Sequence, residues 1–396
     1  MRFLMLTTSY PSPMRPHAGM YNRSLAEALA GEHEVRVVAP VAWPDAILAA
    51  VRRARGSARK ATAATAPALQ VLRPLYLYTP WVFRNQYGLF MRASVRGALR
   101  SLFARFRPDV VIGYWAHPDG EAAVAAARAS DAVALVVVGG SDVLLLTRDP
   151  GRRRAILKVL RSADAVLAVG SALRERVIEM GVPAQRVHVF EQGVDLALFN
   201  PGDRGAARRR IGLRPDDRIV LWVGRMVEVK ALDVLIAAGA RLRARGVAFQ
   251  LYLVGDGPLA ERVRSWIRDA SGEDVMHVVG PVEHARLADW YRAADLTVLA
   301  SRSEGVPNVL RESLACGTPF VATCVGGIPE LVREPSQIVP PGDPEALAGA
   351  IERQLSSVAA SMPPPGHSSW ADAASSVAAL ARSLRENTAP PARNRR

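Results

Sequence analysis

Two glutamates eight residues apart, Glu304 and Glu312, stand where a strand expected over 296–299 gives way to a helix. Pro307 is expected to open that helix, because its missing N–H is harmless at the first helical position. The free N–H groups of the first turn would then form an anion site suited to a diphosphate; they belong to Asn308, Val309 and Leu310. One carboxylate could reach sugar hydroxyls while the other accepts from a ribose. Taken alone, the pair favours a plainer interpretation, a loop acid and a surface helix acid.

A second charged pair, Arg225 and Lys230, follows the strand expected over 219–223. Two cations at the end of a buried strand can clamp a diphosphate and stabilise charge on a departing nucleotide. The alternative is a solvated basic loop. Against it, only three of the 51 basic residues are lysine, and Lys230 is the only one after residue 158. A compact ammonium has been kept where phosphate binding would use one, so we favour the phosphate-binding role.

Glycines and one histidine follow other expected strands. Gly255, Asp256 and Gly257 come after the strand 249–254, where glycine lets the backbone approach a ligand, although such a turn is also ordinary between a strand and a helix. Gly19 lies beyond the first strand. His117 stands just past the strand 110–114, and a lone histidine there is as often structural as functional.

The elements that must position these residues alternate along nearly the whole chain. Helical patterns such as 25–29, 95–106 and 232–242 separate short apolar runs. Most of the runs are continuous rather than alternating, which is typical of strands buried on both faces; they cover 3–7, 35–39, 110–114, 134–138, 165–169, 219–223, 249–254, 275–278, 296–299 and 320–322. The alternation predicts an α/β fold of doubly wound parallel sheets.

The alternation pauses between about 199 and 217, and the chain divides there into two similar halves. We expect two Rossmann-like domains, 1–200 and 201–365, facing across a cleft onto which the strands' carboxyl ends open. After a proline-rich break, a C-terminal helix within 366–387 is expected to pack back on the N-terminal domain. The polar, basic tail 388–396 is expected to be disordered.

The net charge of +14 over 396 residues is uneven, with +11 in residues 1–200 and +3 in the remainder. Nucleic acid, an anionic membrane and acidic small substrates are the partners that such a charge suits. Between Asp45 and Asp109 there are twelve basic residues and no acid. Arginines recur there every fourth residue on one expected helix, opposite an apolar face; they are Arg92, Arg96 and Arg100. We expect this region, 46–108, to form an acceptor or membrane face.

Two cysteines without metal-ligand spacing, Cys316 and Cys324, suggest neither a disulfide framework nor a zinc site. The chain shows no signal-peptide pattern and no apolar run long enough to span a membrane. A cytoplasmic protein, peripheral at the inner face of the membrane, is therefore expected.

In combination, the motifs strongly resemble the donor-binding region of retaining glycosyltransferases of the GT-B fold, family four. Residues 301–330 carry most of the resemblance, through Glu304, Glu312 and the flanking segments 315–319 and 325–330. The resemblance implies that Glu304 contacts the hydroxyls of the donor sugar and that Glu312 contacts the ribose. It also implies that Gly224, Arg225 and Lys230 hold the phosphates.

By the same resemblance, the segment 255–257 borders the nucleotide, Gly19 belongs to a loop that closes over the donor phosphate, and His117 contacts the donor sugar near the reacting centre. The residues with implied catalytic roles are His117, Arg225, Lys230 and Glu304. Two departures place the acceptor side in doubt: the segment 139–142 reads Gly-Gly-Ser-Asp without the usual histidine, and 191–195 reads Glu-Gln-Gly-Val-Asp where Pro-Asn-Gly-Val-Asp is common.

The expected activity is transfer of a sugar, with retention, from a UDP- or GDP-sugar to a lipid-linked, glycan or other hydroxyl acceptor, in glycan, polysaccharide or glycolipid biosynthesis. The N-terminal domain would take the acceptor and the C-terminal domain the donor. No cofactor, metal or nucleic-acid partner is expected, since the two cations and a helix N-terminus can supply the electrostatics. A sugar-nucleotide epimerase or hydrolase is an alternative on the same scaffold. A basic nucleic-acid-binding protein is a distant one that rests on net charge alone.

Overall fold

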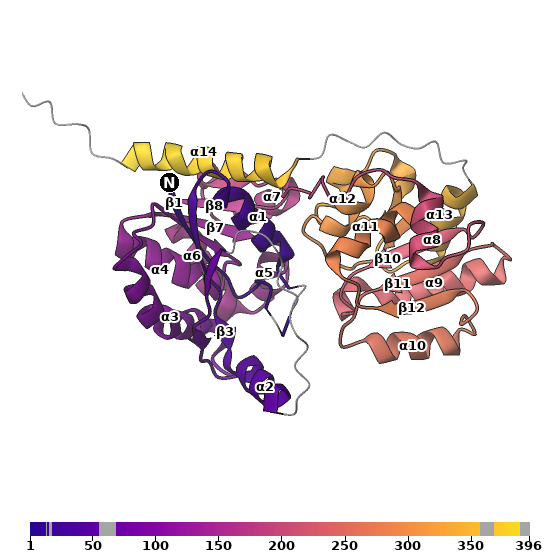
Figure 1. Ribbon diagram of the computed structural model, residues 1–396, viewed down its shortest axis with the longest axis horizontal. Coiled ribbons are helices and arrows are strands. Elements are labelled where there is room, and N and C mark those ends of the chain that lie inside the picture. Colours follow the sequence, from indigo (N-terminus) through magenta and orange to yellow (C-terminus); the bar gives the residue numbers. More distant parts are fainter. Residues whose placement is uncertain (13, 16–17, 55–68, 357–367, 389–396) are drawn as a thin grey trace, which may run out of the picture. The chain divides into compact units, whose positions relative to one another are not determined.

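The computed structural model describes residues 1–12, 14–15, 18–54, 69–356 and 368–388. The chain forms two compact units (Figure 1). Unit 1 consists of Met1–Gly193 and Trp370–Arg396, and unit 2 of Val194–Ser369. The segment 194–200, which the sequence places at the end of the first domain, is therefore part of unit 2.

Unit 1 is built on a seven-stranded sheet in which every described pair is parallel. Its spatial order is β4 (Gln70–Leu72), β2 (Glu34–Val38), β1 (Arg2–Leu6), β6 (Val110–Tyr114), β7 (Val133–Val138), β8 (Ala165–Ala168) and β9 (Val187–Val189). The central strands are buried throughout, as expected for a sheet covered on both faces. Helices connect them: α1 (Met20–Ala30), α3 (Tyr87–Phe103), α4 (Asp119–Ser130), α5 (Ser141–Leu144), α6 (Pro150–Ser162) and α7 (Ser171–Glu179).

A small excursion leaves this sheet between β2 and α3. It contains a two-stranded parallel sheet of β3 (Val41–Ala42) and β5 (Leu75–Tyr76), and the helix α2 (Trp43–Ala54). None of these three elements was predicted from the sequence. The strands β3, β5, β4 and β9 escaped because runs of two or three residues show no measurable periodicity, whereas the twelve-residue helix α2 was missed.

Unit 2 has a six-stranded sheet, again parallel in every described pair. Its order is β12 (Met276–Gly280), β11 (Gln250–Val254), β10 (Ile219–Val223), β13 (Leu296–Leu299), β14 (Phe320–Thr323) and β15 (Ile338–Val339). The connecting helices are α8 (Arg204–Ile211), α9 (Leu232–Ala244), α10 (Ala260–Asp269), α11 (His284–Ala293), α12 (Asn308–Ala315) and α13 (Pro344–Ser356). The chain winds outward from β10 in one direction and from β13 in the other. The loops after these two strands therefore flank the switch point, where open α/β sheets bind ligands.

The last helix, α14 (Trp370–Thr388), belongs to unit 1 although it follows unit 2 in the chain (Figure 1). It contacts α1 and contributes small buried side chains to the core of unit 1, among them Ala374 and Ala381. Arg385 near its end forms an ion pair with Asp109. The helix includes Thr388, and the remainder of the expected tail, 389–396, lies outside the described residues.

Close backbone packing at the carboxyl edge of unit 2 makes one glycine a sharp test of the fold. Gly255 has φ +135, and a Cβ at this position would lie 1.9 Å from the carbonyl oxygen of Gly224. We predict that Gly255→Ala lowers the free energy of unfolding by about 3 kcal/mol or more, because left-handed strain and a backbone clash add together.

Urea denaturation would measure this loss, with Gly246→Ala as the matched control. Gly246 has φ +71, but a Cβ added there would meet nothing within 4 Å, so only the strain of roughly 1–2 kcal/mol applies to it. Equal losses in the two variants would contradict the close approach.

Candidate active site

The loops after β10 and β13 bring Lys230 and Glu304 together in unit 2. The Lys230 ammonium donates to Glu304 Oε1 at 2.6 Å, and both side chains are largely buried. The Ser301 hydroxyl donates to the same carboxylate oxygen at 2.5 Å. The two loops are also joined by the backbone, since Arg302 N–H donates to the Val229 carbonyl. A cation and a carboxylate from the two sides of the switch point are thus held at one place.

Glu312 lies on α12 and is held by two side chains of α11. The Tyr291 hydroxyl donates to its Oε2 at 2.9 Å, and His284 Nε2 lies 3.3 Å from its Oε1. Tyr291 is fully buried, and burial with the nearby carboxylate raises its pKa well above the usual value, so its hydroxyl keeps its proton and remains a donor. The carboxylate orientation is therefore fixed by α11. Neither Tyr291 nor His284 was singled out in the sequence.

The first turn of α12 offers fewer free donors than the sequence suggests. The N–H of Leu310 donates to the Pro307 carbonyl at 3.1 Å, so this group is not available to a ligand and its expected role is corrected. Within the described residues the N–H groups of Asn308 and Val309 have no backbone acceptor. The side-chain Oδ1 of Asn308 is buried without a partner there. Two backbone donors remain at the positive end of the helix dipole.

Arg225 differs from Lys230 in having an exposed side chain. It forms no hydrogen bond or ion pair with any other residue that the structure describes. A guanidinium without a carboxylate partner can take a phosphate in a bidentate manner. The two cations predicted as a pair thus stand in different states, one neutralised by Glu304 and one unneutralised.

Glycines at the carboxyl edge of the sheet let the loops of unit 2 lie close to one another, and among them are the predicted donor-binding residues Gly224, Gly255 and Gly257. A Cβ on Gly257 would come within 2.4 Å of the Met226 carbonyl oxygen, and one on Gly326 within 2.0 Å of that of Glu304. Gly224 packs on the ring of Trp222 and presents its carbonyl to Gly255. Asp256 turns its carboxylate onto the N–H of Gly257. These residues shape the loops that carry Arg225 and Glu304.

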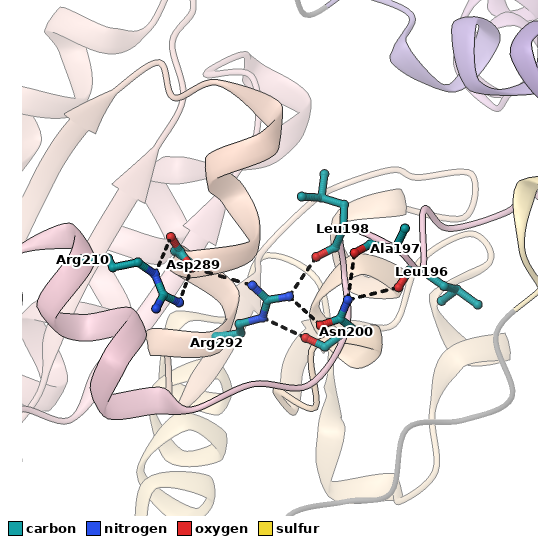
Figure 2. Close-up of polar contacts among 7 residues, drawn as sticks. All are labelled: Leu196, Ala197, Leu198, Asn200, Arg210, Asp289 and Arg292. Atoms are coloured by element: carbon teal, nitrogen blue, oxygen red, sulfur yellow. Dashed lines mark hydrogen bonds and ion pairs between the residues drawn. The ribbon is translucent and has the colours of Figure 1, made fainter. Parts of the chain in front are cut away.

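A polar network fixes the start of unit 2 to α11 (Figure 2). The Arg292 guanidinium donates to the carbonyls of Leu198 and Asn200, each at 2.9 Å, and to Asn200 Oδ1 at 2.7 Å. Asp289, one turn earlier on α11, accepts from Arg210 of α8. Phe199 packs edge-on against both His284 and Tyr291. The segment that opens unit 2 is therefore attached to the two side chains that hold Glu312.

Asp295, one residue before β13, has the structural role that its position suggests. Its carboxylate accepts from Ile219 N–H at 2.7 Å and pairs with Arg204 and Arg208. The contacts tie α8 to the entrances of β10 and β13, at the opposite end of these strands from Glu304.

In unit 1, His117 lies past the end of β6 and is almost fully buried, with 2% of its surface exposed. Its Nε2 accepts from the backbone N–H of Gly88 at 3.1 Å. Burial above all, with the positive charge of Arg152, lowers its pKa to about 4 against the opposing effect of the Asn85 carbonyl. The imidazole is therefore neutral near pH 7 and carries its proton on Nδ1. It can donate a hydrogen bond but does not act as a cation.

Two buried carboxylates position the loops around His117. Asp142 accepts from the N–H groups of Ala116, Gly140 and Val143, and so joins the loop after β6 to that after β7. Asp119 accepts from the N–H and the hydroxyl of Thr8, beyond β1. Burial raises the pKa of Asp119 to about 7 and that of Asp142 to about 6, despite these donors. Asp142 is thus a positioning residue.

Gly19 caps the N-terminus of α1 in the left-handed region, with φ +66. A Cβ there would lie 1.9 Å from the carbonyl oxygen of Ser9, which also accepts from the Asn22 side chain at 2.7 Å. Close approach to the loop after β1 therefore requires glycine at this position, and the expected contact with the donor phosphate stays a prediction. Pro16 and His17 lie outside the described residues.

The arginine ridge of α3, which consists of Arg92, Arg96 and Arg100, is exposed as expected. Apolar side chains, among them Met91 and Val95, are buried on the other side of the helix. Arg92 lies 3.8 Å from Glu121 of α4. For Arg96 and Arg100 the described residues offer no ion pair. Within the wider expected face 46–108, residues 55–68 lie outside the described part of the chain.

Among the described residues, no helix combines the length and apolar character that a membrane crossing requires. No three His, Cys, Asp or Glu side chains of the described residues gather as metal ligands do.

Two Rossmann-like units, the second with a cluster of charged side chains at its switch point, form the GT-B architecture. Solved structures share it along nearly the whole chain. Sucrose-phosphate synthase from Thermosynechococcus elongatus superposes with a TM-score of 0.76 at 21% identity, covering 98% of this chain and 99% of that one. HepE of Anabaena, solved in complex with UDP-glucose, gives a TM-score of 0.68 at 16% identity and covers 98% of each chain.

Family models match both units: one described as Glycosyltransferase Family 4 over residues 18–198, and one described as Glycosyl transferases group 1 over residues 217–357. The chain belongs to glycosyltransferase family 4.

Similar proteins include D-inositol 3-phosphate glycosyltransferase of Acidothermus cellulolyticus, 37% identical over 226 residues, which are 52% of this chain and 49% of that protein. The chain thus matches about half the length of that relative. TuaC of Bacillus subtilis, named as a teichuronic acid biosynthesis glycosyltransferase, is 29% identical over 366 residues, or 89% of each chain.

The Lys230–Glu304 pair predicts a measurable coupling. Lys230→Met leaves the Glu304 carboxylate largely buried without its cation, and Glu304→Gln leaves the ammonium without its anion. In a double-mutant cycle followed by urea unfolding, we expect the two substitutions to couple by about 1–3 kcal/mol. Additive losses would contradict the pairing. The control is a second cycle on an exposed ion pair, Arg302→Gln with Asp233→Asn. These two substitutions should couple by less than about 1 kcal/mol.

The buried imidazole of His117 predicts a distinct pH dependence. Its pKa is about 4 in the folded protein against an ordinary 6.5, so the unfolded chain binds this proton first. The ring therefore reduces stability as the pH falls from 6.5 to 4 and has no such effect above about pH 7. Comparison of the wild-type protein with His117→Gln at pH 7 and pH 5 should show the wild type losing more stability. Nitrogen-15 NMR should show that the His117 imidazole is still neutral at pH 5.5. A pKa near 6.5 for this ring would contradict its burial.

Proposed function

We propose that the protein transfers a sugar from a nucleotide-diphosphate-sugar to a hydroxyl acceptor with retention of anomeric configuration. The observation that carries the proposal is the arrangement at the switch point of unit 2. There, an unneutralised guanidinium, a Lys–Glu pair and two free helix N–H groups stand on adjacent loops, and Glu312 is fixed on α12. This set provides donors for a diphosphate and acceptors for sugar hydroxyls.

Each group has a task that its surroundings support. Arg225 and the N–H groups of Asn308 and Val309 bind the diphosphate. Lys230 is shared between Glu304 and the donor, so it can stabilise the charge that develops on the departing phosphate. Glu312, held by Tyr291 and His284, accepts from the ribose hydroxyls.

Glu304 is the acceptor for the donor-sugar hydroxyls. Its carboxylate binds Lys230 and Ser301 through the same oxygen, Oε1, and Oε2 accepts no hydrogen bond from the described residues. One oxygen is thus used to position the side chain and the other remains for a ligand. In unit 1, neutral His117 is the proposed donor through Nδ1: the Asn85 backbone is close enough to affect the pKa of the ring, but Nδ1 makes no hydrogen bond with the described residues.

The chemical step that we propose proceeds on one face of the donor sugar. The bond from the anomeric carbon to the phosphate oxygen breaks, and the acceptor oxygen forms its bond to that carbon on the same side. The proton of the acceptor hydroxyl passes to the departing phosphate oxygen. The chain then contributes positioning and charge stabilisation rather than a general base, and we propose that it does so without a metal or cofactor.

The named relatives guide the choice of substrates. HepE binds UDP-glucose in its solved complex, which supports a UDP-sugar as the first donor to test, with GDP-sugars second. The names of the other relatives mention D-inositol 3-phosphate and teichuronic acid biosynthesis, which makes a phosphorylated polyol and a glycan the first acceptors to test. We propose that the acceptor is lipid-linked or a glycan and that the protein has no nucleic-acid partner. We also propose that it is cytoplasmic and peripheral at the inner face of the membrane. Arg92, Arg96 and Arg100 would then lie on the side that contacts the acceptor or the membrane.

Nucleotide binding tests the site directly. Calorimetric titration with UDP, GDP and ADP should identify one that binds, and Arg225→Ala and Lys230→Ala should each weaken it by about tenfold or more, because a charge-assisted hydrogen bond contributes about 1.5–3 kcal/mol. Tyr291→Phe should weaken it less, since Glu312 keeps its carboxylate and loses one of its two supports.

Arg286→Ala is the matched control, an arginine on α11 outside the proposed site. Unchanged affinity in Arg225→Ala, Lys230→Ala and Glu312→Ala together would refute the site. Product analysis with the binding nucleotide's sugar then separates the alternatives, because epimerised or free sugar without a glycosylated acceptor would identify an epimerase or hydrolase.

A further inference from the structure

Exposed apolar side chains are concentrated in one short part of unit 1. Of the twelve large apolar side chains that are exposed among the described residues, nine come from the segment between residues 47 and 89. They are Ile47, Leu48, Val51, Leu75, Leu77, Trp81, Val82, Phe83 and Leu89. Surface apolar residues scattered singly are normal, but a contiguous group marks an interaction site. We call this group the apolar tip.

The base of the apolar tip is firmly held. Tyr76 is buried and stacks on Tyr78, which meets Tyr87 edge-on. The Tyr87 hydroxyl donates to the Thr79 carbonyl at 2.9 Å, and the Trp43 indole of α2 donates to the Tyr78 carbonyl at 2.8 Å. These contacts fix the backbone on both sides of residues 80–83 and join α2 to the same structure.

The outer part of the tip consists of three consecutive large side chains that contribute little to this packing. Trp81 is 81% exposed, and Val82 and Phe83 are each more than half exposed. Trp81 and Phe83 also have positive φ values, 71 and 53. Bulky residues are rare in the left-handed region and point to a functional constraint. The backbone thus adopts an unfavourable conformation while presenting aromatic rings to solvent.

Neighbouring elements extend the apolar surface. Leu75 and Leu77 lie two residues apart on and beside β5, so they share one face of the strand, opposite buried Tyr76. The helix α2, which contacts β3 and β5, exposes Ile47, Leu48 and Val51.

The surroundings of the tip are positively charged. The Arg84 guanidinium lies over the Trp81 ring at 5.6 Å, and Arg96 and Arg100 follow on α3 without an ion pair in the described chain. The sequence has no acid from 46 to 108. Exposed apolar side chains that include a tryptophan under an arginine, in a stretch of sequence without an acid, match the interface of an anionic bilayer, where tryptophan is favoured and each basic residue adds about 1 kcal/mol.

We propose that the apolar tip inserts into the interfacial region of an anionic membrane, with Trp81, Val82 and Phe83 as the inserting side chains and Arg84, Arg96 and Arg100 contacting lipid headgroups. The inference deepens the proposed function, on which it rests for a membrane-bound acceptor. It gives the apolar side chains, rather than the arginine ridge alone, the main part in attachment.

Vesicle flotation of the full chain tests the proposal. With vesicles of phosphatidylcholine mixed with phosphatidylglycerol, we expect Trp81→Ser/Phe83→Ser to bind about tenfold more weakly than the wild-type protein. The variant lacks two aromatic side chains that would be partly buried in the bilayer interface. The matched control is Val189→Ser, which removes an exposed apolar side chain of β9 in the same unit. It should bind like the wild type. Equal binding by all three proteins would overturn the proposal.

The charge contribution is tested separately. Arg96→Gln/Arg100→Gln should weaken binding to the anionic vesicles by about tenfold or more at low salt, from about 1 kcal/mol for each residue. The difference should shrink as salt is added. On vesicles of phosphatidylcholine alone, the same variant should bind like the wild type, and a weaker binding there would contradict the headgroup role.

A probe at the tip reports insertion itself. Phe83→Cys in a Cys324→Ser background carries one accessible thiol, since Cys316 is buried. A polarity-sensitive dye on that thiol should shift to the blue with the anionic vesicles. An unchanged spectrum would overturn insertion. Sedimentation without vesicles that shows a dimer in the wild type and a monomer in Trp81→Ser/Phe83→Ser would overturn it in favour of self-association.

These measurements need neither donor nor acceptor, so their outcome does not depend on nucleotide binding. Trp81→Ser/Phe83→Ser should bind nucleotide like the wild type, because the tip belongs to unit 1 and the residues proposed to bind the diphosphate and ribose belong to unit 2. Loss of vesicle binding with intact nucleotide binding supports the inference. If the wild-type protein binds vesicles but no nucleotide, the proposed function is refuted and the inference that the apolar tip binds membranes is still supported.

Discussion

The candidate site depends on backbone contacts between loops at the carboxyl edge of the sheet in unit 2. The loops after β10, β11, β13 and β14 lie so close that Gly255 abuts the Gly224 carbonyl and Gly326 abuts that of Glu304. No side chain could fill these positions without moving the backbone. Because parallel strands all end at one edge, such contacts join loops that are distant in sequence. The loops that carry Lys230 and Glu304 are joined to each other by the backbone hydrogen bond from the Arg302 N–H to the Val229 carbonyl, and the two side chains pair beside it.

A second set of contacts reaches from Glu312 to the first residues of unit 2. Its carboxylate is held by Tyr291 and His284, both packed against Phe199. Arg292 of the same helix grips the carbonyls on either side of that phenylalanine (Figure 2). A change in the path of the chain where it enters unit 2 would therefore reach Glu312 through α11. Glu312 is thus the end of a packed chain of aromatic and polar side chains, and the proposed function adds the ribose hydroxyls to its contacts.

The sequence predicted the framework of both units because buried parallel strands are continuous apolar runs. β6, β10 and β13 have the predicted limits, and strands of two or three residues escaped detection. Residue types at strand ends also located Lys230 and Glu304, but not the bond between them, because 74 residues separate the pair. The spacing that placed Leu310 in a helix turn could not show that its N–H is taken by Pro307. Tyr291 and His284 carried one available signal: seven residues apart, they lie on one face of a helix.

Charge is used differently in the two units, and this explains the uneven net charge. In unit 2 many of the arginines lie against carboxylates: Arg204 and Arg208 against Asp295, Arg210 against Asp289, Arg302 against Asp233. Arg225, on the loop after β10 that also carries Lys230, has no such partner in the described chain. In unit 1 the surplus lies between residues 46 and 108, a stretch of sequence with twelve basic residues and no acid. Unpaired positive charge self-repels and lowers stability, as does an exposed aromatic side chain left out of the core. Both occur together around Trp81, and a single anionic, partly apolar partner would relieve both.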